Sequence, residues 1–157
     1  MSVAFRRESD DEHLEPKFEL PIPPGPNRVT ERGARLIEAK VAEWEARIAT
    51  AEAEGASEES IKSLKRDLRY WTTRHATMEI QPPAEGDEAA FGTRVRYRLN
   101  GQVKEVAIVG DDEADPGAGL ISFSSPLARA LIGASEGDFA DFGGKTDAIE
   151  IMGVEAI

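Results

Sequence analysis

The sequence contains no cysteine. This absence excludes disulfide bonds, thiolate metal sites and a cysteine nucleophile. No apolar run approaches the roughly 18 residues that a membrane-spanning helix needs. The first residues also lack the apolar core of a signal peptide, because the chain turns acidic directly after residues 1–7. We therefore expect a soluble, cytoplasmic protein without a membrane partner.

Positive charge is scarce, since 19 lysines and arginines stand against 30 aspartates and glutamates and the formal net charge is −11. Binding of duplex nucleic acid through counterion release is disfavoured at this charge. A protein partner with a basic surface suits the charge better; the alternative is that the acidic residues only keep the protein soluble. We expect contact with RNA or DNA only through a larger protein complex.

The first 28 residues are charged and then rich in proline. Five prolines lie close together in this segment: Pro16, Pro21, Pro23, Pro24 and Pro26. Proline lacks an amide donor and has a fixed φ, so neither a helix nor a central strand is expected here. We predict a flexible arm over residues 1–28. The alternative is that its apolar residues pack on a neighbouring surface: Phe18, Leu20 and Ile22.

Residues 29–80 follow a helical period. Seam residues recur at alternating spacings of three and four, first at Ile37, Val41, Trp44, Ile48 and Ala51, and then at Ile61, Leu64, Leu68, Trp71, His75 and Met78. Two such heptad seams predict an antiparallel coiled-coil hairpin, because each stripe can be buried only against the other. Thr30 and Ser57 are the expected N-caps and Gly55 the break between the helices. His75 is expected to be a partly buried core residue.

A basic stripe follows the second predicted helix and consists of Lys62, Lys65, Arg66, Arg69 and Arg74. Such a stripe faces either phosphate groups or an acidic wall of a partner, or it is only a solvated face of the helix.

Pro82 and Pro83 end the second predicted helix and begin a linker at residues 81–90. After this linker, apolar residues recur at every second position. Asn100 and Gly101 predict a tight hairpin turn. Pro126 is well placed at the start of a short helix over residues 127–132. Strands are expected at residues 93–99, 103–109, 120–123, 138–142 and 148–154. The fold class is therefore α+β, with the helical hairpin followed by an antiparallel β-sheet domain at residues 91–157 that has one short helix.

Four short motifs in the second half stand in an order typical of a known domain. Residues 91–95 read FGTRV, residues 109–116 read VGDDEADP, residues 121–133 read ISFSSPLARALIG and residues 136–138 read EGD. They resemble the C-terminal domain of the GreA/GreB transcript-cleavage factors. The VTERG stretch at residues 29–33 is similar to the segment that opens the helical hairpin of that family. The chain is thus identified as a divergent member of the GreA/GreB family.

The resemblance implies an FKBP-like C-terminal domain that binds the rim of the RNA polymerase secondary channel. It also implies a coiled coil that enters the channel towards the active centre. In the family, the serine–proline segment before the short helix belongs to the docking surface, and here this carries over to Ser124, Ser125 and Pro126. Many members have aspartate at the position of Ser124. The expected protein is a monomeric transcription factor that binds RNA polymerase and modulates elongation, not an enzyme.

The resemblance also assigns a role to the tip of the hairpin (residues 54–60). The family's cleavage factors carry carboxylates there that help hold a second Mg²⁺ ion at the catalytic centre of the polymerase. Here the tip reads EGASEES, with Ala56 in place of the first aspartate and a shortened connection. Glu58 and Glu59 are the candidate tip carboxylates for such a shared Mg²⁺ ion. The alternative, which we prefer, is that they only favour the helix N-terminus through its macrodipole, which leaves no catalytic residue, metal or cofactor in the chain itself.

Two other classes of function compete with this one. An FKBP-like prolyl isomerase needs an aromatic-lined apolar pocket, and the second half of the chain has no tryptophan to build it. A pure interaction module would recruit a regulator through the hairpin, but a self-buried seam leaves little apolar surface for a partner helix. The acidic loop at residues 111–115 lacks the glycine and terminal glutamate of an EF-hand, so we expect a solvated turn there.

Overall fold

The computed structural model describes residues 19–157, so most of the predicted arm, including Phe18, lies outside the described residues. The described chain forms two compact units. The first contains Glu38–Ala76 together with the segment that ends at Pro24, and the second contains Gly25–Ile37 and Thr77–Ile157. No helix within residues 19–157 is long and apolar enough to cross a membrane.

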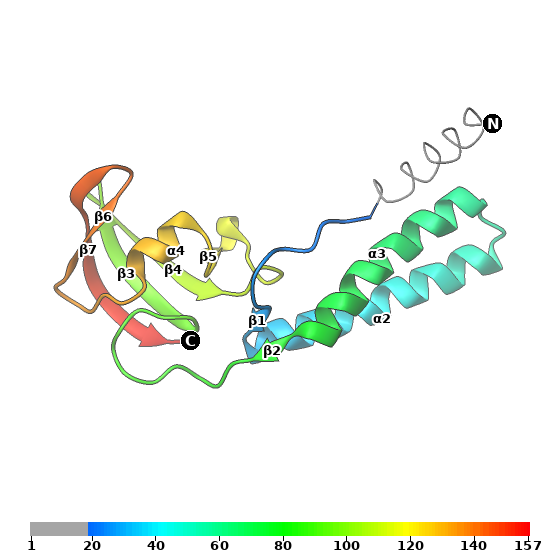
Figure 1. The fold of residues 1–157 in the computed structure, drawn as a ribbon, viewed down its shortest axis with the longest axis horizontal. Helices are drawn as coiled ribbons and strands as arrows, with labels where there is room; N and C mark the ends of the chain where they lie inside the picture. The colour runs from blue at the N-terminus through cyan, green and yellow to red at the C-terminus, as the bar shows by residue number, and fades with distance from the viewer. Residues whose placement is uncertain (1–18) are drawn as a thin grey trace, which may run out of the picture. The chain divides into compact units, whose positions relative to one another are not determined.

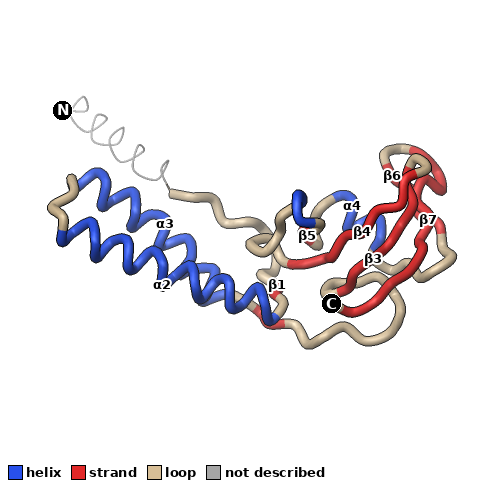
Figure 2. The backbone as a smooth tube through the Cα atoms, turned by 180° about the vertical axis from the view of Figure 1, so that it is seen from behind, coloured by secondary structure: helices blue, strands red, loops and turns tan. Residues whose placement is uncertain are grey.

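Two helices, α2 (Glu31–Ala53) and α3 (Glu58–Thr77), run side by side in opposite directions (Figures 1 and 2). Ile48 is buried on the seam, and Trp44 and Trp71 are half-buried there. The Lys40 Nζ atom on α2 lies 5.9 Å from the centre of the Trp71 ring on α3. The predicted helical hairpin is therefore confirmed.

The seam departs from the predicted register near the end of α3. His75 is exposed, and its Nε2 atom lies 3.9 Å from Glu38 Oε2, whereas the neighbouring Arg74 is only 1% exposed. The prediction of a core histidine was wrong, and Arg74 does not belong to an exposed basic stripe because its side chain is buried. A straight helix drifts relative to a strict heptad repeat, and arginine can bury its aliphatic stem in an apolar position.

A short two-stranded ladder precedes and follows the helices. Strand β1 (Arg28–Val29) pairs in parallel with β2 (Glu79–Ile80). The Glu79 amide donates to the Asn27 carbonyl at 2.8 Å. The predicted boundary between arm and hairpin, at residues 28 and 29, thus falls inside β1. Residues 25–37 belong to the same compact unit as the sheet.

The second unit contains a five-stranded sheet in the order β5-β4-β3-β7-β6. Its strands are β3 (Thr93–Leu99), β4 (Gln102–Val109), β5 (Leu120–Ser122), β6 (Phe139–Phe142) and β7 (Lys145–Ala156). Its helices are the short 3-10 helix η2 (Pro116–Ala118) and α4 (Pro126–Leu131). The α+β class, with a helical hairpin followed by a sheet domain, is confirmed.

The sheet is mixed, whereas the sequence predicted an antiparallel one. Strand β5 pairs with β4 in parallel, with Ile108 opposite Ile121. A hairpin turn would reverse the chain, but residues 110–119 instead carry it back along β4 through η2, so that β5 enters the edge in the direction of β4. At the other end of β4, Asn100 and Gly101 both have positive φ, of 53° and 77°, as the predicted tight turn requires.

The core of this unit lies between the sheet and α4. Alternate residues of β3 are buried, as the period of two predicted, while the arginines between them point away. Leu131 of α4 is fully buried in the same cluster as Val95 and Ile149. Burial raises the pKa of Tyr97, whose ring also lies in this core.

The backbone of Arg28 passes close to Gly110 and leaves no room for a side chain there. A Cβ atom at position 110 would be 2.3 Å from the Arg28 carbonyl oxygen, and backbone cannot yield as a side chain does. We expect Gly110→Ala to lower the free energy of unfolding by about 1–3 kcal/mol, measured by urea denaturation with far-UV circular dichroism.

Gly117→Ala is the matched control, because its Cβ atom would meet Asp115 Oδ1 at 3.6 Å, an ordinary contact. Its stability should stay within about 0.5 kcal/mol of the native chain. Equal stability of the two variants would contradict the close approach of residues 28 and 110.

Candidate functional site

Residues 124–126, which we call the docking turn, connect β5 to α4. Ser124 and Pro126 are exposed and Ser125 is half-buried. The Ser125 hydroxyl accepts a hydrogen bond from the Ala128 amide at 3.3 Å and so caps α4, and Pro126 occupies the first helical turn. The residues that the sequence assigned to docking are thus brought together at the surface. Their part in binding stays a prediction.

Hydroxyl groups and one carboxylate hold the docking turn in place. The Ser122 hydroxyl donates to Asp111 Oδ1 at 2.5 Å and accepts from the Ser124 amide at 3.2 Å. The Ser124 Oγ atom lies 2.9 Å from Ser122 Oγ and 3.3 Å from Asp111 Oδ1. This network fixes an exposed hydroxyl beside a carboxylate. The arrangement presents a polar, acidic surface that suits a basic partner.

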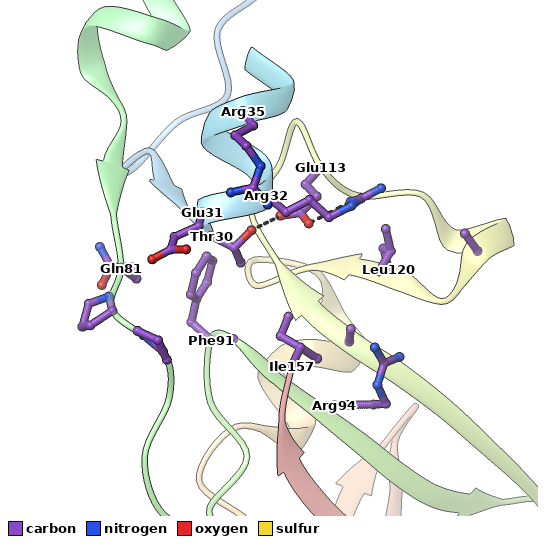
Figure 3. Close-up of a pocket in the computed structure, with 15 residues that line it drawn as sticks. Thr30, Glu31, Arg32, Arg35, Gln81, Phe91, Arg94, Glu113, Leu120 and Ile157 are labelled. Carbon is purple, nitrogen blue, oxygen red and sulfur yellow. Dashed lines mark hydrogen bonds and ion pairs between the residues drawn. The ribbon is translucent and has the colours of Figure 1, made fainter. Parts of the chain in front are cut away.

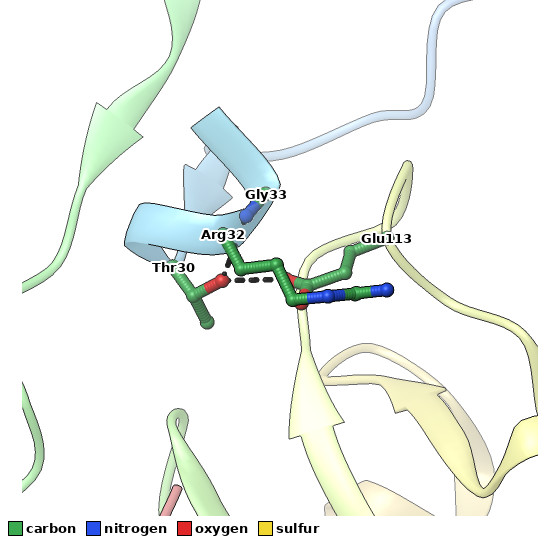
Figure 4. A network of polar contacts seen from close by, with 4 residues as sticks. All are labelled: Thr30, Arg32, Gly33 and Glu113. Atoms are coloured by element: carbon green, nitrogen blue, oxygen red, sulfur yellow. Dashed lines mark hydrogen bonds and ion pairs between the residues drawn. The ribbon is translucent and has the colours of Figure 1, made fainter. Parts of the chain in front are cut away.

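Glu113, in the same loop, lies at the centre of a second polar cluster, which we call the Glu113 cluster (Thr30, Arg32, Gly33 and Glu113; Figure 4). Thr30 Oγ1 donates to Glu113 Oε1 at 2.6 Å, and Arg32 Nη1 donates to Glu113 Oε2 at 2.9 Å. The Gly33 amide donates to Thr30 Oγ1 at 2.9 Å, which makes Thr30 the N-cap of α2 as predicted. One hydroxyl therefore both caps a helix and binds a buried carboxylate.

The burial of Glu113 corrects the prediction of a solvated acidic turn. Its side chain is only 4% exposed, because charge-assisted bonds from Thr30 and Arg32 replace water at both oxygens. Gly33 leaves the necessary space, since a Cβ atom there would lie 2.9 Å from Glu113 Oε1. The sequence offered no signal that pairs residues so far apart, although both lie in segments that carried the family resemblance.

A cavity of about 620 Å³ lies beside the Glu113 cluster (Figure 3). Arg32 and Arg35 line it from α2, and Arg94 lines it from β3. Phe91 is the one aromatic residue among those that line it. The cavity therefore lacks the aromatic lining that a prolyl isomerase requires.

The hairpin tip is a tight turn. The Gly55 amide donates to the Glu52 carbonyl at 3.2 Å and the Ala56 amide to the Ala51 carbonyl at 2.9 Å, with a φ of 73° at Gly55. These two bonds form a Schellman motif that ends α2. The Ser57 hydroxyl accepts from the Ser60 amide at 3.1 Å and caps α3, so that both local predictions hold.

Glu58 and Glu59 are exposed in the first turn of α3. This position favours negative charge through the helix macrodipole. Within residues 19–157, no group of three histidines, cysteines, aspartates or glutamates is placed to hold a metal ion. Glu58 and Glu59 fit a Mg²⁺ ion only as one or two additional oxygen ligands, if a partner holds the ion. Their role as metal ligands stays a prediction.

Comparison with known proteins agrees with the resemblance seen in the sequence. The family model for the C-terminal part of the transcription elongation factors GreA/GreB matches residues 83–156. Transcription elongation factor GreA of Rhizobium leguminosarum bv. trifolii is 39% identical over 110 residues, which cover 68% of this chain and 66% of that protein. GreA of Nitratidesulfovibrio vulgaris is 36% identical over 87 residues, or 53% of each chain, so this chain spans about half the length of several curated relatives that it matches.

Among solved structures, GreA factor homolog 1 of Thermus thermophilus aligns with 84% of this chain and all of that chain, at 16% identity and a TM-score of 0.38. The family assignment depends on the sequence matches. The segment that matches the family model includes the loop of the Glu113 cluster and the docking turn. The chain belongs to the GreA/GreB family of transcription elongation factors.

Proposed function

We propose that this protein binds RNA polymerase at the rim of its secondary channel and modulates transcription elongation. The sheet domain docks at the rim and the α2–α3 hairpin enters the channel. One observation carries the proposal: the docking turn lies at the surface, inside the segment that matches the family model, with Ser124 positioned by Asp111 and Ser122. The family membership supports the general role in transcription elongation.

The hairpin has the properties that entry into a polar channel requires. Its apolar residues are directed to the seam between α2 and α3, and Ile48 is buried there. The remaining surface is charged, so the hairpin needs no apolar groove on its partner. With 23 residues, α2 is about 35 Å long, which is enough to extend well into a large enzyme.

The tip supports modulation by occupancy of the channel, not by transcript cleavage. Ala56 brings no carboxylate to the position where the family's cleavage factors have aspartate. The Schellman motif and the Ser57 cap close the connection within a few residues. The connection is therefore too short to form an extended acidic loop. Glu58 and Glu59 are the carboxylates that remain, and their location in the first turn of α3 already explains their charge.

Ser124→Arg tests the docking turn directly. The larger, basic side chain would meet a basic rim, and we expect the affinity for core RNA polymerase to fall by about tenfold, or about 1.4 kcal/mol, in fluorescence anisotropy.

Thr146→Arg on β7 is the matched control, because Thr146 is also an exposed hydroxyl residue and lies outside the docking turn. Its affinity should equal that of the native chain. An equal loss in both variants, or no complex with the native chain at micromolar concentration, would contradict the proposed docking.

Glu58→Ala and Glu59→Ala test the tip. In a backtracked elongation complex we expect the native chain and both variants to leave the RNA at the length that the polymerase alone produces, because Ala56 stands where the family's cleavage factors carry an aspartate. Gel analysis of the labelled transcript measures this. Shortened RNA with the native chain that disappears in either variant would establish metal-assisted cleavage and overturn the preference for occupancy alone.

A further inference from the structure

The cavity beside the Glu113 cluster lies wholly within the second unit. Every described residue that lines it belongs to Gly25–Ile37 or to Thr77–Ile157. Its volume of about 620 Å³ falls in the range of about 300–1,000 Å³ that small-molecule sites occupy. The hydrogen bonds from Thr30 and Arg32 to Glu113 hold one of its walls in place. A cavity of this size with a fixed wall has the properties of a site for a small molecule.

The charge of this cavity is opposite to that of the chain. The charged side chains that line it are those of Arg32, Arg35, Arg94, Glu31 and Glu113. Three guanidinium groups and two carboxylates give these side chains a net charge of +1, whereas the whole chain carries −11. The cavity therefore attracts anions although the protein as a whole repels them.

Two of the three arginines are available to a ligand. Arg35 is exposed and forms no ion pair with any residue in the part of the chain that the structure describes, 19–157. The Arg94 Nη1 atom is 4.0 Å from Glu105 Oε1, which is too long for a hydrogen bond. Arg32 differs from both, because its Nη1 atom donates to Glu113 at 2.9 Å. Arg35 and Arg94 are thus the residues with donors to offer to an anion.

The position of these two arginines favours an anion with several charged oxygens. Arg35 lines the cavity from α2 and Arg94 from β3, so that they reach it from different walls (Figure 3). A di- or triphosphate can extend from one guanidinium group to the other. The planar guanidinium group also matches phosphate oxygens with two parallel hydrogen bonds. A polyphosphate group therefore fits this pair better than a single carboxylate does.

The rest of the cavity suits a planar ring with polar edges. Figure 3 shows Phe91, Gln81 and Glu31 on the side away from Arg94. The Phe91 ring offers a surface on which a nucleobase can stack. Gln81 Nε2 donates to the Glu79 carbonyl at 3.0 Å, and the amide oxygen of Gln81 can accept from a base amino group. The exposed carboxylate of Glu31 can accept from sugar hydroxyls.

The basic residues of α3 are a weaker alternative for the same anion. The Glu19 carboxylate accepts a hydrogen bond from Arg69 Nε at 2.8 Å, and Leu20 and Ile22 line a groove on α3. The described end of the arm thus packs on this helix, as one of the two sequence-based alternatives expected. The chain's own carboxylate already occupies Arg69, whereas Arg35 has no such partner within residues 19–157.

We propose that the cavity of the second unit binds a nucleoside di- or triphosphate. The phosphates lie between Arg35 and Arg94, and the base stacks on Phe91. Binding of this ligand does not depend on docking to RNA polymerase, so the proposal can be tested on the isolated full chain and fails or holds separately from the proposed function.

An NMR titration of the full chain with ATP and with GTP tests the location and the ligand together. We expect amide shifts centred on residues 31–35 and 91–94, with a Kd below about 1 mM. Inorganic triphosphate and adenosine should each bind at least about tenfold more weakly than ATP, because each makes only one part of the contacts. Equal affinity for triphosphate and ATP, or tighter binding of a hexaglutamate peptide, would overturn the proposal of a nucleotide.

Arg35→Gln and Arg94→Gln test the two phosphate contacts. Each variant should weaken ATP binding by about tenfold, since a charge-assisted hydrogen bond is lost. Arg96→Gln is the matched control, because Arg96 is an exposed arginine of the same strand as Arg94 and does not line the cavity. Its affinity should equal that of the native chain. An equal loss in the control, shifts centred on residues 62–69 of α3, or no shifts with either nucleotide would overturn the proposal.

Discussion

The buried carboxylate of Glu113 is the interaction on which the second unit depends. A buried charge is costly unless it is paired, and here a helix-capping hydroxyl and a guanidinium satisfy both oxygens. Gly33 and Gly110 provide the space that this approach needs. The same loop carries Asp111, which binds the hydroxyls that hold the docking turn. One loop therefore organises both the start of α2 and the surface proposed to bind a partner.

The two units divide the proposed tasks according to their chemistry. The sheet unit offers a fixed, polar turn whose geometry is determined by short hydrogen bonds. The hairpin buries its apolar seam within itself and ends in a turn that both a glycine and a serine cap stabilise.

The sequence predicted the features that local chemistry determines. Thr30 and Ser57 cap the helices and Gly55 ends α2, as predicted. These roles depend on neighbouring residues alone. Three features depend on packing between distant segments and were not predictable: the parallel direction of β5, the burial of Arg74 in place of His75, and the burial of Glu113. The docking turn was located through a resemblance, and its hydrogen bonds to Asp111 became visible only in the fold.

The central claim is that the hairpin tip reaches the interior of RNA polymerase while the sheet domain stays outside. A photo-cross-linker on Ala56→Cys, compared with one on Arg129→Cys of α4, tests this most directly in the complex with core polymerase. The account predicts that the tip label is attached to residues near the catalytic centre and that the α4 label is attached to the channel rim. Attachment of the tip label to the outer surface of the polymerase would contradict the account, wherever the α4 label is attached.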